Sequence, residues 1–164
     1  MINIRQKTEL WPVAISRVLI GILWLFSLRW KLPPEFAAAD GRGLMYWLEQ
    51  EAQYPAFEIY GEFVALIVIP NFTIFAWIVF LAELFVGLSL FTGTLTRLGG
   101  AVGLLLALNL AIGLLEVPNE WPWSYIMLAM WHATFVVMAA GRTLGVDGWL
   151  MSRYPHSRTL RWLA

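Results

Sequence analysis

The sequence predicts an all-α membrane protein, a four-helix transmembrane bundle with short amphipathic helices in the extracytoplasmic loop between helices one and two. Four apolar runs approach the roughly 20 residues that a helix needs to cross a hydrocarbon core; they are 13–30, 72–92, 98–115 and 124–140. Of the 164 residues, 60% are hydrophobic and 13% charged, and the mean hydropathy is +0.68. A soluble protein of this composition would expose a large apolar surface, so a lipid bilayer is the expected solvent. The length suits one bundle, so we expect residues 1–164 to form a single domain.

The first apolar run, 13–30, has features of a secretory signal peptide. Arg5 and Lys7 precede it, and the small residues 37–39 follow it. The run is nevertheless long and rich in tryptophan for the apolar part of a signal peptide. We therefore expect a retained first helix.

The segment between the first and second runs is too long to be a turn. Residues 43–52 are expected to form an amphipathic helix, with Leu44, Trp47 and Leu48 on one face. A second helix is expected over 57–69, ending at Pro70. These pieces are too short and too acidic to cross a membrane, so they are expected to lie over the outer mouth of the bundle.

The distribution of charge predicts the topology. Basic residues lie before the first apolar run, in the turn at Arg97 and after the fourth run. Segment 33–70 instead has six acids and one base, Arg42. The positive-inside rule then places both termini in the cytoplasm. Arg29 and Lys31 lie on the opposite side, which suggests either partners in the acidic loop or an outer surface that attracts anions.

Ionisable residues inside the apolar runs are the first candidates for function, because a charge at the bilayer centre costs at least about 2.5–3.5 kcal/mol. Glu83 is a candidate catalytic acid that exchanges protons with a quinone; the alternative is a structural ion pair. Arg17 either extends to the lipid headgroups, holds an anionic group of a cofactor, or pairs with Glu83. Their depths, roughly 9 and 14 Å from the cytoplasmic ends of their helices, predict an Arg17–Glu83 pair.

The second candidate catalytic residue is His132, in the fourth run. A histidine can donate to a quinone carbonyl and relay a proton, although a hydrogen-bonded packing role is the simpler alternative. Asn109 lies at a similar depth and offers a second polar contact. We expect a quinone-sized apolar crevice at His132, lined in part by Trp77 or Trp131.

Composition also excludes several kinds of site. The chain has no cysteine and only two histidines, so disulfides, cysteine-ligated clusters and a multi-histidine metal site are not expected. No basic tract is interleaved with aromatic residues, so no nucleic-acid partner is expected.

Two groups of short motifs resemble the DoxX/DoxD family of small four-helix membrane proteins. The first group lies in and around the first two runs. It comprises Arg17, Gly21, residues 68–71, Glu83, Gly87, Gly93 and Thr96-Arg97. The second comprises residues 120–125 and the Gly-Arg-Thr-Leu-Gly-Val-Asp sequence at 141–147. The Trp-Pro-Trp segment and this ending are most similar to the DoxD branch. That branch includes the membrane subunit of thiosulfate:quinone oxidoreductase, which passes electrons from thiosulfate to quinone and yields tetrathionate. The resemblance implies a prokaryotic cytoplasmic membrane and transfers no catalytic residues.

The expected function is therefore that of a membrane subunit of a quinone-linked oxidoreductase, working with an additional protein subunit. Arg29, Lys31 and Arg42 would attract an anionic sulfur substrate, while Glu83, His132 and Asn109 would face the quinone. One alternative is a non-catalytic accessory subunit packed against a larger respiratory or photosynthetic complex. A small transporter is a third reading, which the absence of interrupted apolar runs disfavours.

Overall fold

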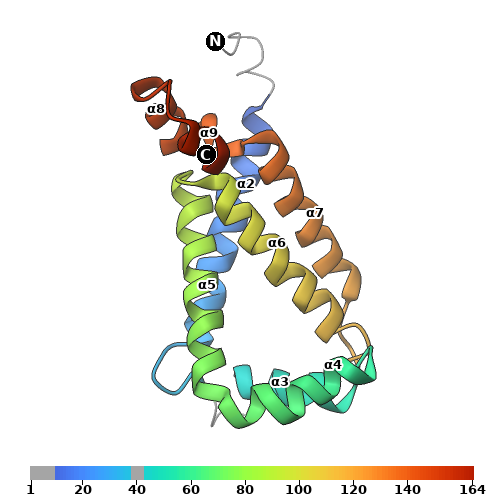
Figure 1. Ribbon diagram of the computed structural model, residues 1–164. Helices are drawn as coiled ribbons and strands as arrows, with labels where there is room; N and C mark the ends of the chain where they lie inside the picture. Colours follow the sequence, from blue (N-terminus) through green and yellow to red (C-terminus); the bar gives the residue numbers. More distant parts are fainter. Residues whose placement is uncertain (1–9, 38–42) are drawn as a thin grey trace.

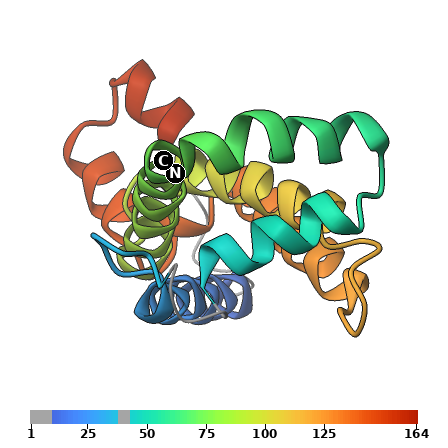
Figure 2. The same cartoon turned by 90° about the horizontal axis from the view of Figure 1, so that it is seen from below.

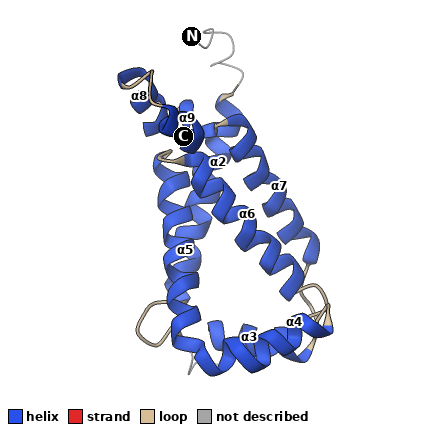
Figure 3. Ribbon diagram, in the orientation of Figure 1, coloured by secondary structure: helices blue, strands red, loops and turns tan. Residues whose placement is uncertain are grey.

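The computed structural model describes residues 10–37 and 43–164. All regular secondary structure in these two ranges is helical (Figure 3). This confirms the predicted all-α class. The expectations for Arg5, Lys7 and Arg42 lie outside the described residues.

Four long helices form the body of the protein (Figure 1). They are α2 (Trp11–Ser27), α5 (Phe72–Thr92), α6 (Thr96–Gly113) and α7 (Pro122–Met138). Helix α2 begins with a proline in its first turn, as does α7, where the missing N–H removes no helical hydrogen bond. Helix α2 packs along α5, and α6 along α7. Helices α5 and α6 meet at one end and diverge toward the other (Figure 1).

Three helical segments are long and apolar enough to cross a membrane: Trp11–Trp30, Glu58–Thr92 and Thr96–Gly113. The first is α2 continued by the 3₁₀ turn η1 (Leu28–Trp30). Large apolar side chains on their outer faces are exposed, including Leu19, Ile74 and Leu105, as expected of helices that contact lipid. Helix α7 is also apolar but has only 17 residues. The prediction of a helical membrane protein is thus supported, while the fourth span stays a prediction.

The segment between α2 and α5 forms a helical layer across the divergent end of the bundle (Figures 1 and 2). Its helices are α3 (Leu44–Gln53), α4 (Glu58–Phe63), the π-helical η3 (Val64–Val68) and the 3₁₀ turn η4 (Ile69–Asn71). Helices were expected at 43–52 and 57–69, and both are present. The chain turns into α5 at η4, which contains Pro70.

The opposite end of the bundle is closed by the turn between α5 and α6 and by the segment after α7. That segment comprises η5 (Ala140–Arg142), α8 (Val146–Arg153) and α9 (Arg158–Leu163). Gly93 ends α5 with φ +71°, and α6 begins at once. Asp147 of α8 accepts hydrogen bonds from the backbone N–H groups of Leu95 and Thr96, at 2.7 and 2.9 Å, and so caps α6.

The closely packed core lies between these two ends. Ile20 and Trp24 of α2 pack with Val86 and Leu90 of α5 and with Phe135 of α7. Val102, Leu106 and Leu110 of α6 pack against this cluster, so the core joins all four long helices.

Candidate functional site

A buried ion pair joins the end of α2 to the middle of α5. Nζ of Lys31 lies 2.5 Å from Oε1 of Glu83, and the two side chains are only 8% and 3% exposed. The hydroxyl of Ser27 donates to the other carboxylate oxygen, Oε2, at 3.0 Å. Pairing and hydrogen bonding both offset the cost of removing these charges from water.

The side chain of Lys31 is held on a second side by an aromatic ring. Its ammonium lies 4.4 Å from the centre of the Trp30 ring, within the range of a cation–π interaction. Lys31 follows η1 immediately, so the helix end positions its backbone while Glu83 and Trp30 position its charge. The charge of Lys31 is thus engaged by Glu83, and the expectation that Lys31 attracts an anionic substrate stays a prediction.

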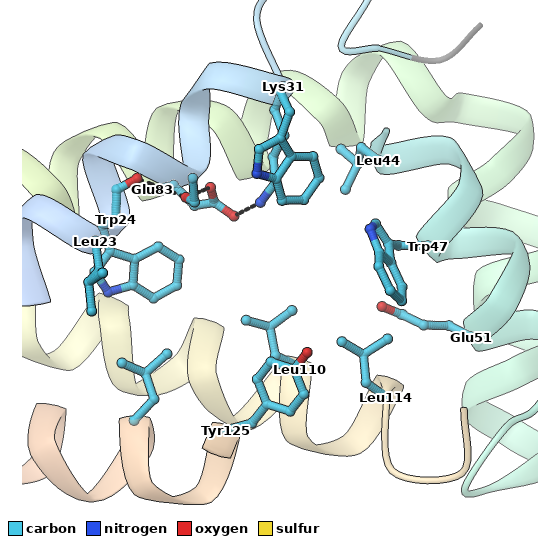
Figure 4. A pocket seen from close by; sticks show the side chains of 13 residues that line it. Leu23, Trp24, Lys31, Leu44, Trp47, Glu51, Glu83, Leu110, Leu114 and Tyr125 are labelled. Carbon is cyan, nitrogen blue, oxygen red and sulfur yellow. Dashed lines mark hydrogen bonds and ion pairs between the residues drawn. The ribbon is translucent and has the colours of Figure 1, made fainter. Parts of the chain in front are cut away.

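The ion pair borders a cavity of about 310 Å³ between α2, α5, α6, α7 and α3 (Figure 4). Its walls are chiefly aromatic and aliphatic. The lining residues are Leu23, Trp24, Ser27, Trp30, Lys31, Leu44, Trp47, Glu51, Glu83, Leu110, Leu114, Tyr125 and Leu128. An apolar pocket with a few converging polar groups is typical of a small-molecule site, and roughly 300 Å³ is the lower end of the usual range.

Glu51 of α3 is the second carboxyl group at this cavity, on the far side from Glu83 (Figure 4). Burial raises the pKa of Glu51 above its usual range, and a hydrogen bond from the Tyr60 hydroxyl, at 2.7 Å, partly opposes that shift. Sequence reasoning missed Glu51 because it is one of six acids in an acidic segment. The signal was its spacing: with Leu44, Trp47 and Leu48 it completes an i, i+3, i+4, i+7 face.

His132 does not line this cavity; it is buried where α7 meets α2 and α6. The indole N–H of Trp24 donates to its Nε2 at 2.9 Å. Its ring also covers Gly103 of α6, where an added Cβ would lie 2.2 Å from Cε1. The predicted crevice at His132 is wrong, since the ring is fully buried and packed on both sides.

The two tryptophans expected in that crevice also lie outside the cavity. Trp77 packs edge-on against Phe36, with ring centres 5.4 Å apart, and Trp131 packs against Phe135 at 5.9 Å. Neither lines either of the two cavities described here. The structure therefore does not bring His132, Trp77 and Trp131 together with Glu83.

The predicted Arg17–Glu83 ion pair is also wrong. Arg17 is fully buried at the closed end of the bundle. Its guanidinium donates to the backbone carbonyls of Leu90 and, at 2.7 Å, Leu144. Glu83 lies two helical turns before Leu90 on α5 and is paired with Lys31 instead. Backbone carbonyls at a helix C-terminus carry partial negative charge, which explains why a cation is stable there.

The remaining candidates are dispersed. Asn109 lines a second cavity, where its Oδ1 lies 3.4 Å from the Tyr60 hydroxyl. Arg29 is exposed and its guanidinium lies 5.9 Å from the centre of the Phe26 ring. Within residues 10–37 and 43–164, no group of three or more metal-ligating side chains is found.

The fold and the composition of its helices define an all-helical protein with the features of a membrane protein. Comparisons with protein-family models, with curated proteins and with solved structures find no match. The cavity and its ion pair are therefore the basis for assigning a function.

Proposed function

We propose that this chain is a quinone-binding membrane subunit of an oxidoreductase, and that the quinone ring occupies the cavity beside Lys31 and Glu83. The observation that carries the proposal is the buried ion pair at the wall of an apolar, aromatic-rich cavity. The ammonium of Lys31 would donate to a quinone oxygen, and the carboxylate of Glu83 would accept or deliver a proton. The aromatic walls favour a flat ring.

The electrons for this reaction would come from outside the chain. Reduction of a quinone to its hydroquinone consumes two electrons and two protons. Oxidation of two thiosulfate ions to tetrathionate releases two electrons, so thiosulfate is a balanced donor for the proposed reaction. Because the chain has no cysteine, it cannot supply a cysteine-ligated cluster or a thiol relay to carry them. We therefore include a second protein subunit, located with this one in a prokaryotic cytoplasmic membrane, in the proposal.

A second candidate function is that of a non-catalytic accessory subunit in a larger membrane complex. The observation that favours it is that three of the buried ionisable side chains bind structural partners: Lys31 pairs with Glu83, and Arg17 donates to backbone carbonyls. In this reading the polar groups hold helices together and the cavity is filled by lipid.

Quinone binding by the purified protein in mild detergent distinguishes these functions. A short-chain quinone should quench the fluorescence of the cavity tryptophans in a saturable way. It should also be reduced when thiosulfate and the copurifying subunit are present. Glu83→Gln should abolish reduction, whereas Glu116→Gln, at an exposed loop position, should not change it.

Because Glu83→Gln leaves Lys31 buried without its partner, a charge-reversed variant is also needed. The double change Lys31→Glu with Glu83→Lys keeps a pair but moves each charge to the other helix. It should fold better than either single change and remain defective in reduction. Unchanged turnover in a folded Glu83 variant, or turnover of the complex without this chain, would support the accessory function.

A further inference from the structure

Glu51 is buried without a charged partner. Its side chain reaches from α3 to the end of α6, where a Cβ added to Gly113 would lie 2.6 Å from the carboxyl carbon. Tyr60 donates to Oε2. Within the described part of the chain, this is the one hydrogen bond to the Glu51 carboxyl group, so Oε1 has no protein partner, and no cation lies within ion-pair distance of Glu51. Half of this carboxyl group is therefore available to a ligand.

The Glu51 side chain, with its Oε1 unpaired in the described structure, lines the cavity proposed to bind the quinone. Figure 4 shows the Glu51 side chain directed into the cavity from α3, across from the Lys31–Glu83 pair. Glu51 also lines a second cavity of about 370 Å³, which lies between α3, η3, α5 and α6. Glu51 thus stands between the two spaces, and only its Oε2 is used by the protein.

We propose that Glu51 is a ligand-binding residue, which in its protonated form donates a hydrogen bond to the second oxygen of the bound ring. The ligand class follows from the two polar ends of the cavity. It is a flat ring with oxygen acceptors at opposite positions, as in a 1,4-quinone, with one oxygen at Lys31 and the other at Glu51. This inference rests on the proposed function and adds a residue and an orientation to it.

The chemistry requires the acid form of Glu51. A carboxylate has no proton to donate and would repel a carbonyl oxygen, whereas a neutral carboxyl group has one donor. Glu51 lies in an apolar wall and forms no ion pair with any described residue, which favours the neutral form, and burial raises its pKa. Ligand binding should therefore be strong below the pKa of Glu51 and weaken as pH rises through it.

Other titratable groups face this region and must be separated from Glu51. Tyr60 of α4 donates to it, and Tyr125 of α7 donates to Glu120 at 2.6 Å. Lys31 and Glu83 lie on the opposite wall. A Glu120→Gln variant tests the contribution of the Tyr125 pair, and it should keep the wild-type pH dependence.

The experiment measures binding of a short-chain 1,4-benzoquinone by tryptophan fluorescence from about pH 5 to about pH 9. The wild-type protein should lose about tenfold or more in affinity over this range. Glu51→Gln keeps a donor that does not titrate, so its affinity should not change with pH. Glu51→Leu should bind weakly at every pH, and the matched control Glu49→Gln, exposed on the same helix, should behave as the wild type.

A second binding experiment uses a ring of the same size that has a single oxygen. It should bind equally to the wild type and to Glu51→Leu, because it engages only the Lys31 end. The inference is overturned if the wild-type affinity for the quinone is independent of pH, or if Glu51→Gln retains the full pH dependence. Absence of quinone binding by the wild type at any pH would overturn the proposed function as well. Loss of the pH effect alone would leave that function standing.

Discussion

The indole N–H of Trp24 donates to Nε2 of His132 across the interface of α2 and α7, at 2.9 Å. The bond leaves the ring proton of a neutral histidine on Nδ1, which is buried without a hydrogen-bond partner in the described structure. Both side chains are almost completely inaccessible. His132 is thus a packing residue whose position depends on the helix opposite.

Gly103→Ala should destabilise the protein strongly, because the new methyl group would lie 2.2 Å from Cε1 of His132. Overpacking of this kind typically costs about 1–3 kcal/mol. Thermal unfolding in detergent measures the effect. The double variant Gly103→Ala with His132→Ala should recover part of the loss, because the smaller residue frees the space. No recovery would show that the ring is not what the methyl group meets.

The Lys31–Glu83 pair predicts a specific pattern of energetic coupling. Lys31→Met or Glu83→Gln alone should cost about 3–5 kcal/mol, since each leaves one buried charge unpaired. The double variant should cost clearly less than the sum of the two. A double-mutant cycle on folded yield or on unfolding free energy measures this.

The same cycle with Arg17→Met and Glu83→Gln provides the comparison. Arg17 contacts carbonyls near the C-terminus of α5 and not the carboxylate, so the two changes should add. Strong coupling between Arg17 and Glu83 would contradict the arrangement described here.

Asp147→Ala should weaken the closed end of the bundle. It removes the acceptor for the N–H groups of Leu95 and Thr96 and a negative charge at the N-terminus of α6. Loss of a cap typically costs about 0.5–2 kcal/mol. Asp147→Asn keeps one of the two oxygen acceptors and should cost less. Equal losses in the two variants would show that a single remaining acceptor does not stabilise this end of the bundle.

The topology predicted from charge is tested by accessibility. Tags at the two ends of the chain should resist protease added to sealed cells, whereas a cleavage site inserted near position 40 should be cut. Cleavage at either terminal tag in intact cells would contradict the predicted topology, in which both termini lie in the cytoplasm.

Much of the fold follows from sequence pattern. The apolar runs gave α2, α5, α6 and α7, and the spacing of Leu44, Trp47 and Leu48 gave α3. These patterns are local, so one sequence suffices to find them. Glu83 forms an ion pair, as the structural alternative expected, and it lines the cavity; its role as a catalytic acid stays a prediction.

The partners of the buried charges were not predictable in the same way. Lys31 lies beyond the end of α2, so a search for partners within the apolar runs overlooked it. Arg17 is neutralised by backbone carbonyls, which every residue has and which leave no trace in a sequence. The cavity itself depends on how α3 crosses the bundle, a long-range arrangement that periodicity does not determine.

The use of backbone acceptors by Arg17 has a consequence for how this protein can vary. Any residue at positions 90 and 144 offers the same carbonyl oxygen, so the arginine itself places no demand on those side chains. Leu90 is still held by the core in which it packs, whereas the side chain of Leu144 is exposed and can change as long as the chain path is kept. The constraint falls on position 17 and on Gly93, where an added Cβ would lie 2.6 Å from the guanidinium. Among related sequences, an arginine and a distant glycine should therefore be retained together, while the exposed residue at position 144, which supplies one of the acceptors, drifts.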